Sequence, residues 1–247
     1  GPAAKPWNDA TFGTIGGTVT LGESVTVGNM TFGVTGYPVA ADALNAYSLS
    51  FDAGKTVTSI ADAAITEIIT GDNGFTKAGS GILAITATNT FTGALNLDGG
   101  VLNAITDSIN GADVTNGIIF NGGTLQAALG GISTAKAITM TGAGTFDTNG
   151  DNITVSGLVT GAGQLNKVGV GTLTLDLANP DFSGDVNIQG GGIRLVDMGG
   201  LGTSANLVIN DREMPHLEPV LRKGLQDYEK LFRPLLDALA AETSALP

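Results

Sequence analysis

The sequence of 247 residues contains no cysteine, and only 14% of its residues are charged. The lack of cysteine excludes a disulfide framework, a thiol nucleophile and a cysteine-ligated metal. The net charge of -12 argues against nucleic acid as a partner, because a phosphate backbone is bound through Lys and Arg. An anionic bilayer is disfavoured for the same reason. No apolar run approaches the roughly 18 residues that span a membrane, so we expect no membrane insertion by this fragment and no signal peptide.

The sequence has one histidine, His216, which limits a Ser-His-Asp type of catalysis to the surroundings of that residue. No strand-borne nucleophile motif accompanies it, so we interpret it as an exposed histidine at the start of a helix. Polysaccharide-cleaving enzymes use paired carboxylates instead. Most of the candidate carboxylates lie close to Gly, Asn or Pro, where acidic side chains bond to turn backbones. They are Asp98, Asp107, Asp113, Asp176, Asp181 and Asp185.

Arginine is also scarce, since only Arg194 precedes residue 211, and an anionic sugar would therefore meet little positive charge. The stretch 147–152, DTNGDN, has oxygen-bearing side chains at its first, third and fifth positions, as a calcium loop does. Asn152 stands where such a loop needs glycine, and Leu158 where it needs a bidentate glutamate. We expect a polar turn here, and no catalytic residue, cofactor or metal in the chain.

Glycine, by contrast, is abundant: the chain has 38 glycines, and all but Gly224 precede residue 211. They separate short runs in which apolar and polar residues alternate, a pattern that predicts strands with one buried face. Examples are the ranges 18–21, 24–27, 82–85, 153–155 and 172–175. The glycines supply the positive φ angles that tight turns need.

The range 68–104 repeats as 158–195, at an offset of ninety residues that becomes ninety-one after one insertion. Both copies contain Lys-x-Gly-x-Gly-x-Leu, then Asn, then Phe and Gly, then Gly-Gly, and residues 121–125 echo part of this pattern. Repetition of short strands favours a solenoid. At roughly 20 to 25 residues per turn, we expect about eight to ten rungs. The inward residues should stack as one aliphatic column: Leu83, Ile85, Leu95, Leu97, Leu102, Leu173, Leu175, Val186, Ile188 and Ile193.

This pattern resembles the autotransporter-associated β-strand repeat of bacterial autotransporter passengers, and the opening from Ala10 to Tyr37 resembles the module that often precedes such repeats. The resemblance covers about residues 7 to 210. It implies a right-handed parallel β-helix, exported to the outer surface of a Gram-negative bacterium, and frequently an adhesin or autoaggregation factor. The family implies the location better than the ligand.

Composition divides the chain into three parts. We interpret residues 1–6 as a cloning remnant and lead-in, residues 7–210 as the β-helix, and residues 211–247 as an amphipathic helical tail. In the tail, apolar residues recur at spacings of three and four, and Pro215 and Pro219 suit a helix start. The end of a β-helix exposes strand edges and an apolar cross-section, so a cap is our main hypothesis for the tail. A partner site and an incidental fusion are the alternatives.

We expect the repeated Lys77, Lys167 and Gly-x-Gly residues to place turns and strand entries, and the matching Phe91 and Phe182 to stack in the core. Turn-forming asparagines could also bridge rungs, although a simple turn role is favoured. They are Asn89, Asn121, Asn149 and Asn179. The resulting functional hypothesis is a non-catalytic adhesin or stalk with an unknown receptor or glycan as partner. A self-assembling filament subunit and a β-helical polysaccharide-active enzyme are the alternatives.

Overall fold

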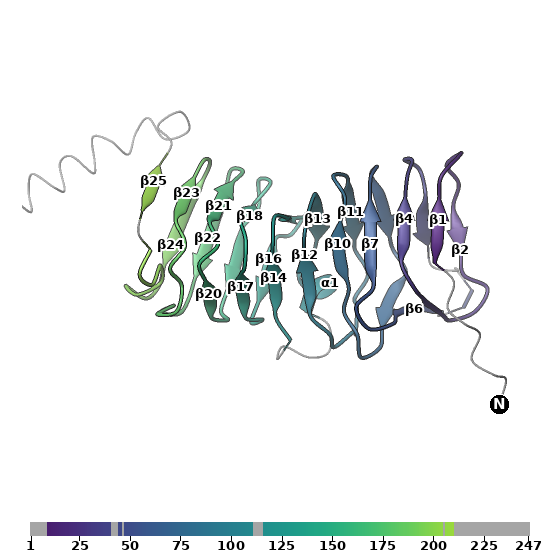
Figure 1. The fold of residues 1–247 in the computed structure, drawn as a ribbon, viewed down its shortest axis with the longest axis horizontal. Coiled ribbons are helices and arrows are strands. Elements are labelled where there is room, and N and C mark those ends of the chain that lie inside the picture. Colours follow the sequence, from purple (N-terminus) through teal and green to yellow (C-terminus); the bar gives the residue numbers. More distant parts are fainter. Residues whose placement is uncertain (1–8, 41–43, 46, 111–115, 205, 210–247) are drawn as a thin grey trace, which may run out of the picture. The chain divides into compact units, whose positions relative to one another are not determined.

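The computed structural model describes residues 9–40, 44–45, 47–110, 116–204 and 206–209. They form an all-β parallel solenoid whose strands stack along one axis (Figure 1). The first face is an eight-stranded sheet of β1 (Ala10–Phe12), β4 (Met30–Phe32), β7 (Thr56–Ser59), β10 (Thr76–Ala78), β12 (Leu95–Leu97), β14 (Ile118–Phe120), β17 (Ile138–Met140) and β20 (Val159–Gly161).

The second face is a ten-stranded sheet of β2 (Val19–Thr20), β5 (Pro38–Ala40), β8 (Ala63–Ile65), β11 (Ile82–Ile85), β13 (Val101–Ala104), β15 (Thr124–Ala127), β18 (Gly144–Asp147), β21 (Leu165–Val168), β23 (Val186–Ile188) and β25 (Leu207–Ile209). The third face holds two shorter sheets. One contains β3 (Val25–Val27), β6 (Ser48–Phe51) and β9 (Ile68–Thr70), and the other contains β16 (Ile132–Thr134), β19 (Ile153–Val155), β22 (Thr172–Leu175) and β24 (Gly192–Leu195).

Every strand pair is parallel, and the register gives the length of each turn of the coil. Ala10 pairs with Met30 and Thr76 with Asn96, so the chain advances 20 residues between those partners. The advance is 21 residues from Leu165 to Val186, and 27 from Met30 to Val57. The short alternating runs of the sequence therefore form single strands, each closed by a turn before the next face begins.

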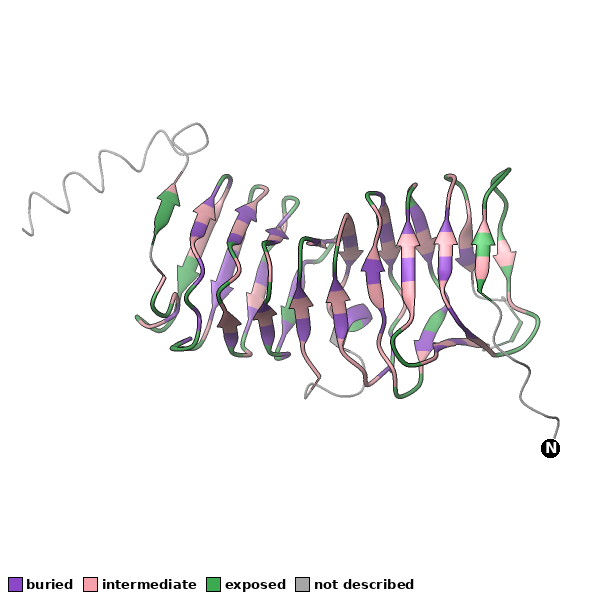
Figure 2. Cartoon of the chain, in the orientation of Figure 1, coloured by how far each residue is buried: buried purple, intermediate pink, exposed green. Residues whose placement is uncertain are grey.

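The interior contains one hydrophobic core that follows the whole solenoid. Burial alternates along most strands, with every second residue turned inward (Figure 2), as expected for a sheet with one solvated face. Aromatic rings in successive turns contact one another, with centroids 4.8 Å apart for Phe12 and Phe32, and 4.9 Å for Phe120 and Phe146. The expected core residues are confirmed as part of this cluster, with Ile193 only partly buried at its edge.

The two repeat copies occupy different faces, which corrects the expectation that their equivalent residues stack in one column. Lys77 lies on β10 of the eight-stranded sheet, whereas Lys167 lies on β21 of the ten-stranded sheet. The reason is arithmetic, because an offset of ninety residues is not a whole multiple of turns of 20 or 21 residues. The second copy is thus displaced along the axis and also rotated by one face.

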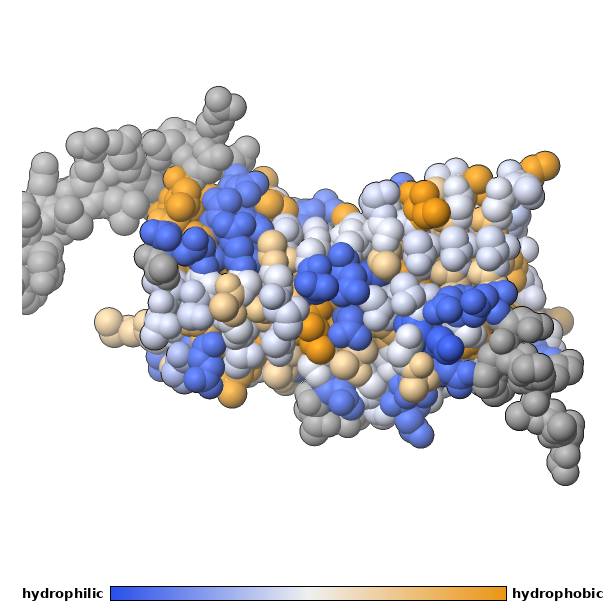
Figure 3. Space-filling model, in the orientation of Figure 1, coloured by the Kyte–Doolittle hydropathy of each residue, from blue (hydrophilic) through white to orange (hydrophobic). Residues whose placement is uncertain are grey.

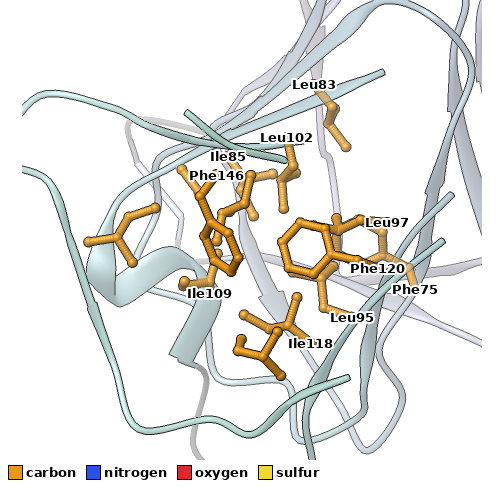
Figure 4. Packing of buried hydrophobic residues seen from close by; sticks show 14 of the residues in the cluster. Phe75, Leu83, Ile85, Leu95, Leu97, Leu102, Ile109, Ile118, Phe120 and Phe146 are labelled. Carbon is orange, nitrogen blue, oxygen red and sulfur yellow. The ribbon is translucent and has the colours of Figure 1, made fainter. Parts of the chain in front are cut away.

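The third face is interrupted between β9 and β16, where the only helix of the described residues, α1 (Thr106–Asn110), replaces a strand. Ile109 on this helix is fully buried, and Figure 4 shows it among Phe146, Ile85 and Ile118. The helix therefore fills the core where the sheet is missing.

Two expectations remain outside this description. The amphipathic helix predicted for residues 211–247 lies outside the described residues, and the right-handed sense of the coil stays a prediction. Within the described ranges, no helix is long and apolar enough to cross a membrane.

Candidate binding surface

Lys77, the first residue of the repeated motif, is a buried structural residue. Its side chain points inward from β10 and is 0% exposed. The Nζ atom donates to the carbonyl oxygens of Ala78 at 2.8 Å, Gly79 at 3.2 Å and Gly99 at 3.0 Å. Gly99 lies in the turn of the following rung, so one ammonium group joins two successive turns.

Lys167 makes the same arrangement in the second copy, on another face of the solenoid. Its Nζ atom donates to the carbonyl oxygens of Val168, Gly169 and Gly190, at 2.6 to 3.0 Å, and to Thr148 Oγ1 at 2.9 Å. Burial lowers the pKa of both lysines to about 8, and the negative charge of Asp147 acts in the opposite direction on the pKa of Lys167. The sequence analysis missed this burial, although inward alternation with Leu165 was a signal for it.

Asn89 and Asn179 bridge three successive rungs, so the simple turn role favoured for them is incomplete. Asn89 Oδ1 accepts from the Ile69 N–H at 2.8 Å, and its Nδ2 donates to the Ser108 carbonyl oxygen at 2.8 Å. Asn179 accepts from the Val159 N–H at 2.7 Å and donates to the Gly200 carbonyl oxygen at 2.6 Å. Both side chains are buried, and these bonds satisfy amides that would otherwise be unpaired.

The remaining repeated residues also serve the fold. Phe91 and Phe182 are fully buried, as predicted. Gly79 and Gly169 have φ angles of 79° and 77°, in the left-handed region that favours glycine. The motif therefore builds a corner of the solenoid.

The candidate carboxylates differ in burial and in their hydrogen bonds. Asp98, Asp107 and Asp181 are exposed on separate parts of the chain, and Asp113 lies outside the described residues, as does His216. Asp185 Oδ1 accepts from Asn206 Nδ2 at 3.0 Å. Asp176 is half-buried beyond the end of β22. Across the described ranges, no group of three His, Cys, Asp or Glu residues could hold a metal ion.

The calcium-like stretch forms the polar turn that the sequence predicts. Asp147 Oδ1 accepts from the Asn149 N–H at 2.9 Å, and Asp147 Oδ2 accepts from Gln126 Nε2 at 2.7 Å. Asn149 has a φ of 48°, and Asn152 Oδ1 accepts from the Thr172 N–H at 2.8 Å. These oxygens thus hold the turn and its neighbouring strands together.

Amide and hydroxyl side chains on the outward surface meet across rungs at several places. Asn103 Nδ2 donates to Gln126 Oε1 at 2.8 Å on the ten-stranded sheet, and Gln126 in turn donates to Asp147. On the third face, Thr26 Oγ1 and Ser50 Oγ are 2.7 Å apart. Figure 3 shows one side of this surface, on which hydrophilic patches border smaller hydrophobic ones and most residues have intermediate hydropathy.

One pocket of about 210 Å³ opens where three successive turns approach the eight-stranded sheet. It is lined by Gly54 and Lys55 before β7, by residues 72–76 around the start of β10, and by Gly93, Ala94 and Asn96 around the start of β12. The turns are joined by backbone bonds from the Thr76 N–H to the Lys55 carbonyl oxygen and from the Asn96 N–H to the Phe75 carbonyl oxygen. We call this the Lys55 pocket.

Comparison with known protein sequences shows that the repeated motif also occurs in other proteins. A family model described as passenger-associated-transport-repeat matches residues 75–104 and 165–195, which lie within the two copies 68–104 and 158–195. Over 191 residues, the chain is 35% identical to the adhesin BmaC autotransporter of Brucella suis biovar 1 (strain 1330), and this stretch covers 75% of the chain and 5% of that adhesin. No solved structure matches the chain. The chain is an adhesin-like autotransporter passenger sequence with two passenger-associated-transport-repeats.

Proposed function

We propose that this chain is a non-catalytic segment of a surface-displayed passenger, exported by a Gram-negative bacterium, and that it acts in adhesion or cell-to-cell association. The observation that carries the proposal is that the repeated residues are buried, whereas polar side chains that could make contacts lie on the surface. Lys77, Asn89, Phe91 and their partners in the second copy are buried and hold the fold. The surface carries amide and hydroxyl side chains on stacked rungs, which suit many weak contacts acting together.

The similarity to an autotransporter adhesin supports this proposal.

The test is surface display of the chain on a non-adherent bacterial strain, with sedimentation and attachment to cultured epithelial cells as readouts. We expect displayed chain to increase at least one of the two, and soluble chain added in excess to reduce that increase. Bacteria displaying a chain with Gly184→Ala provide the matched control, because a Cβ there would overlap the Gly163 carbonyl oxygen and disrupt the corner. Equal behaviour of displaying and non-displaying bacteria would refute the proposal.

A filament subunit is the second candidate, and the last described turns favour it. Exposed apolar side chains gather on β24, on β25 and in the segment between them: Leu195, Val196, Met198, Leu207 and Val208. Such an end can pair with another copy. Light scattering over a concentration series distinguishes a filament, whose mass grows with concentration, from a displayed segment of constant mass.

A further inference from the structure

The Lys55 pocket differs from the rest of the described surface in the charged residues that line it. Three of the four lysines in the described ranges, Lys77, Lys136 and Lys167, are fully buried. Lys55 is half-buried and lines the pocket, with the exposed Asp72 on the same lining. The lining of this pocket therefore includes one lysine and one aspartate.

The uncharged lining residues add further hydrogen-bonding groups. Asn73 and Asn96 contribute amides, Thr76 contributes a hydroxyl, and all three are half-buried. Asn73 Nδ2 is used by the fold, since it donates to the Phe51 carbonyl oxygen at 3.1 Å. Phe75 also borders the pocket, but its side chain is 1% exposed and its ring packs in the core, edge-on against Phe91 with ring centroids 6.1 Å apart. The lining is therefore mainly polar, and its residues come from three successive turns.

The second repeat copy shows what makes this pocket particular to the first. At the offset of ninety to ninety-one residues, Asp72 corresponds to Ala162, Gly74 to Gln164 and Ala94 to Asp185. The first copy has small residues where the second has Gln164 and Asp185, and it has a carboxylate where the second has a methyl group. Gly74 is required by packing, because a Cβ there would overlap the Ala94 carbonyl oxygen. The lysine and asparagine contacts, which both copies share, do not use the side chains of Asp72 or Ala94.

We propose that the Lys55 pocket binds one neutral hexose unit of a glycan. Its volume of about 210 Å³ is below the range of pockets for drug-sized ligands, so it suits a single ring. Sugar hydroxyls both donate and accept, which matches an ammonium, a carboxylate, two amides and a hydroxyl. The opposite charges of Lys55 and Asp72 favour a neutral ligand, and the chain charge of -12 opposes an anionic one. The choice of a glycan rests on the proposed adhesion function.

The test is a titration of the ¹⁵N-labelled full chain with the methyl glycosides of glucose, galactose, mannose and N-acetylglucosamine. We expect saturable shifts of the amide signals of Lys55, Asn73, Thr76 and Asn96 with at least one glycoside. The dissociation constant should be on the order of millimolar, because a single small ring makes few contacts. No saturable shift with any of the four, or shifts confined to other residues, would overturn the proposal.

Variants of the lining residues, compared with control variants elsewhere, test whether the glycoside binds in the Lys55 pocket. Lys55→Ala and Asp72→Ala should each weaken binding by about tenfold or more, because each leaves a sugar hydroxyl without its partner. Arg194→Ala and Asp181→Ala remove the same charges at exposed sites elsewhere and should leave binding unchanged. Asp72→Asn, which keeps the side-chain size, checks that a loss in Asp72→Ala is not a folding defect. Equal affinity of all variants would place the ligand outside the pocket.

The display assay separates this inference from the proposed function. Attachment without glycoside binding contradicts the pocket and leaves the adhesion role intact. Glycoside binding without attachment or sedimentation supports the pocket and contradicts the adhesion role.

Discussion

At the residue scale, the buried lysines explain why the repeat begins with a cation. An ammonium group has three protons, and Lys77 directs them to three carbonyl oxygens from two turns. Two of these carbonyls belong to the turn residues Gly79 and Gly99, and the third belongs to Ala78 at the end of β10. A charged donor forms stronger hydrogen bonds than a neutral one, which offsets part of the cost of burying the charge.

Replacing this ammonium should weaken the fold measurably. Lys77→Met keeps an apolar side chain of similar length and leaves three carbonyl oxygens without their donor. We expect the free energy of unfolding to fall by about 1–3 kcal/mol, as measured by urea denaturation followed by circular dichroism. Lys55→Met, at a half-buried surface position, should change it by less than about 0.5 kcal/mol. Equal effects of the two variants would show that the corner contacts contribute nothing.

The lowered pKa values predict a pH dependence with a defined sign. The pKa of Lys77 and of Lys167 is about 8 in the folded chain, below the ordinary value of 10.5. Between those values the unfolded chain binds more protons, so the contribution of both lysines to the free energy of unfolding rises with pH. It is fully present above pH 10.5 and is lost as the pH falls through 8. The stability of the native chain minus that of the double variant Lys77→Met/Lys167→Met should therefore increase from pH 8 to 10. A flat difference would contradict the lowered pKa values.

At the scale of the element, each rung depends on side chains from its neighbours. Asn89 fixes the amide of Ile69 in β9 on one side and the carbonyl of Ser108 in α1 on the other. It therefore stabilises the third face at its interruption, alongside the backbone bond from the Thr90 N–H to the Ile69 carbonyl oxygen.

Removing the Asn89 side chain should increase local unfolding at β9, in the preceding rung. Asn89→Ala should increase hydrogen exchange at the Ile69 amide by about five- to a hundredfold, which corresponds to the loss of about 1–3 kcal/mol of local protection. Exchange followed by NMR measures this directly. Asn166→Ser is the control, because Asn166 faces outward on β21 and its hydrogen bonds to the Gly144 carbonyl oxygen and with Asn187 are long, at 3.5 Å. The Ile69 amide should be unaffected in that variant, and unchanged exchange in Asn89→Ala would refute the bridging role.

Alternation in the sequence located strands such as β11, β19 and β22 well, because each face of a strand follows a period of two. Alternation could not predict on which face of the solenoid each repeat copy lies, because that depends on the summed lengths of all the intervening turns. The buried lysines were missed because burial of a charge is expected only where partners are visible, and theirs are backbone carbonyls. The Lys55 pocket combines residues from three turns, so no local pattern could predict it.

At the scale of the whole molecule, the last described turns leave the core partly uncovered. Strand β24 ends in two exposed residues, and β25 begins with two, whereas both ends of β23 are buried. We propose that residues 211–247 cover this apolar surface as a cap.

Removal of residues 211–247 tests the cap. A chain ending at Asn210 should self-associate, because Leu207 and Val208 are more than half exposed on an edge strand. Light scattering coupled to size exclusion should show a molar mass that grows with concentration for the truncated chain only. An unchanged, constant mass for both chains would show that these residues have another role.

The central claim is that the repeated residues hold the fold while other, outward-facing residues carry recognition. Its most direct test compares attachment to epithelial cells of beads coated with the intact chain and with Lys77→Met, at a temperature where circular dichroism shows both to be folded. We predict equal attachment of the two, above that of uncoated beads. A folded Lys77→Met chain that no longer attaches would contradict the claim, because the repeat itself would then take part in recognition.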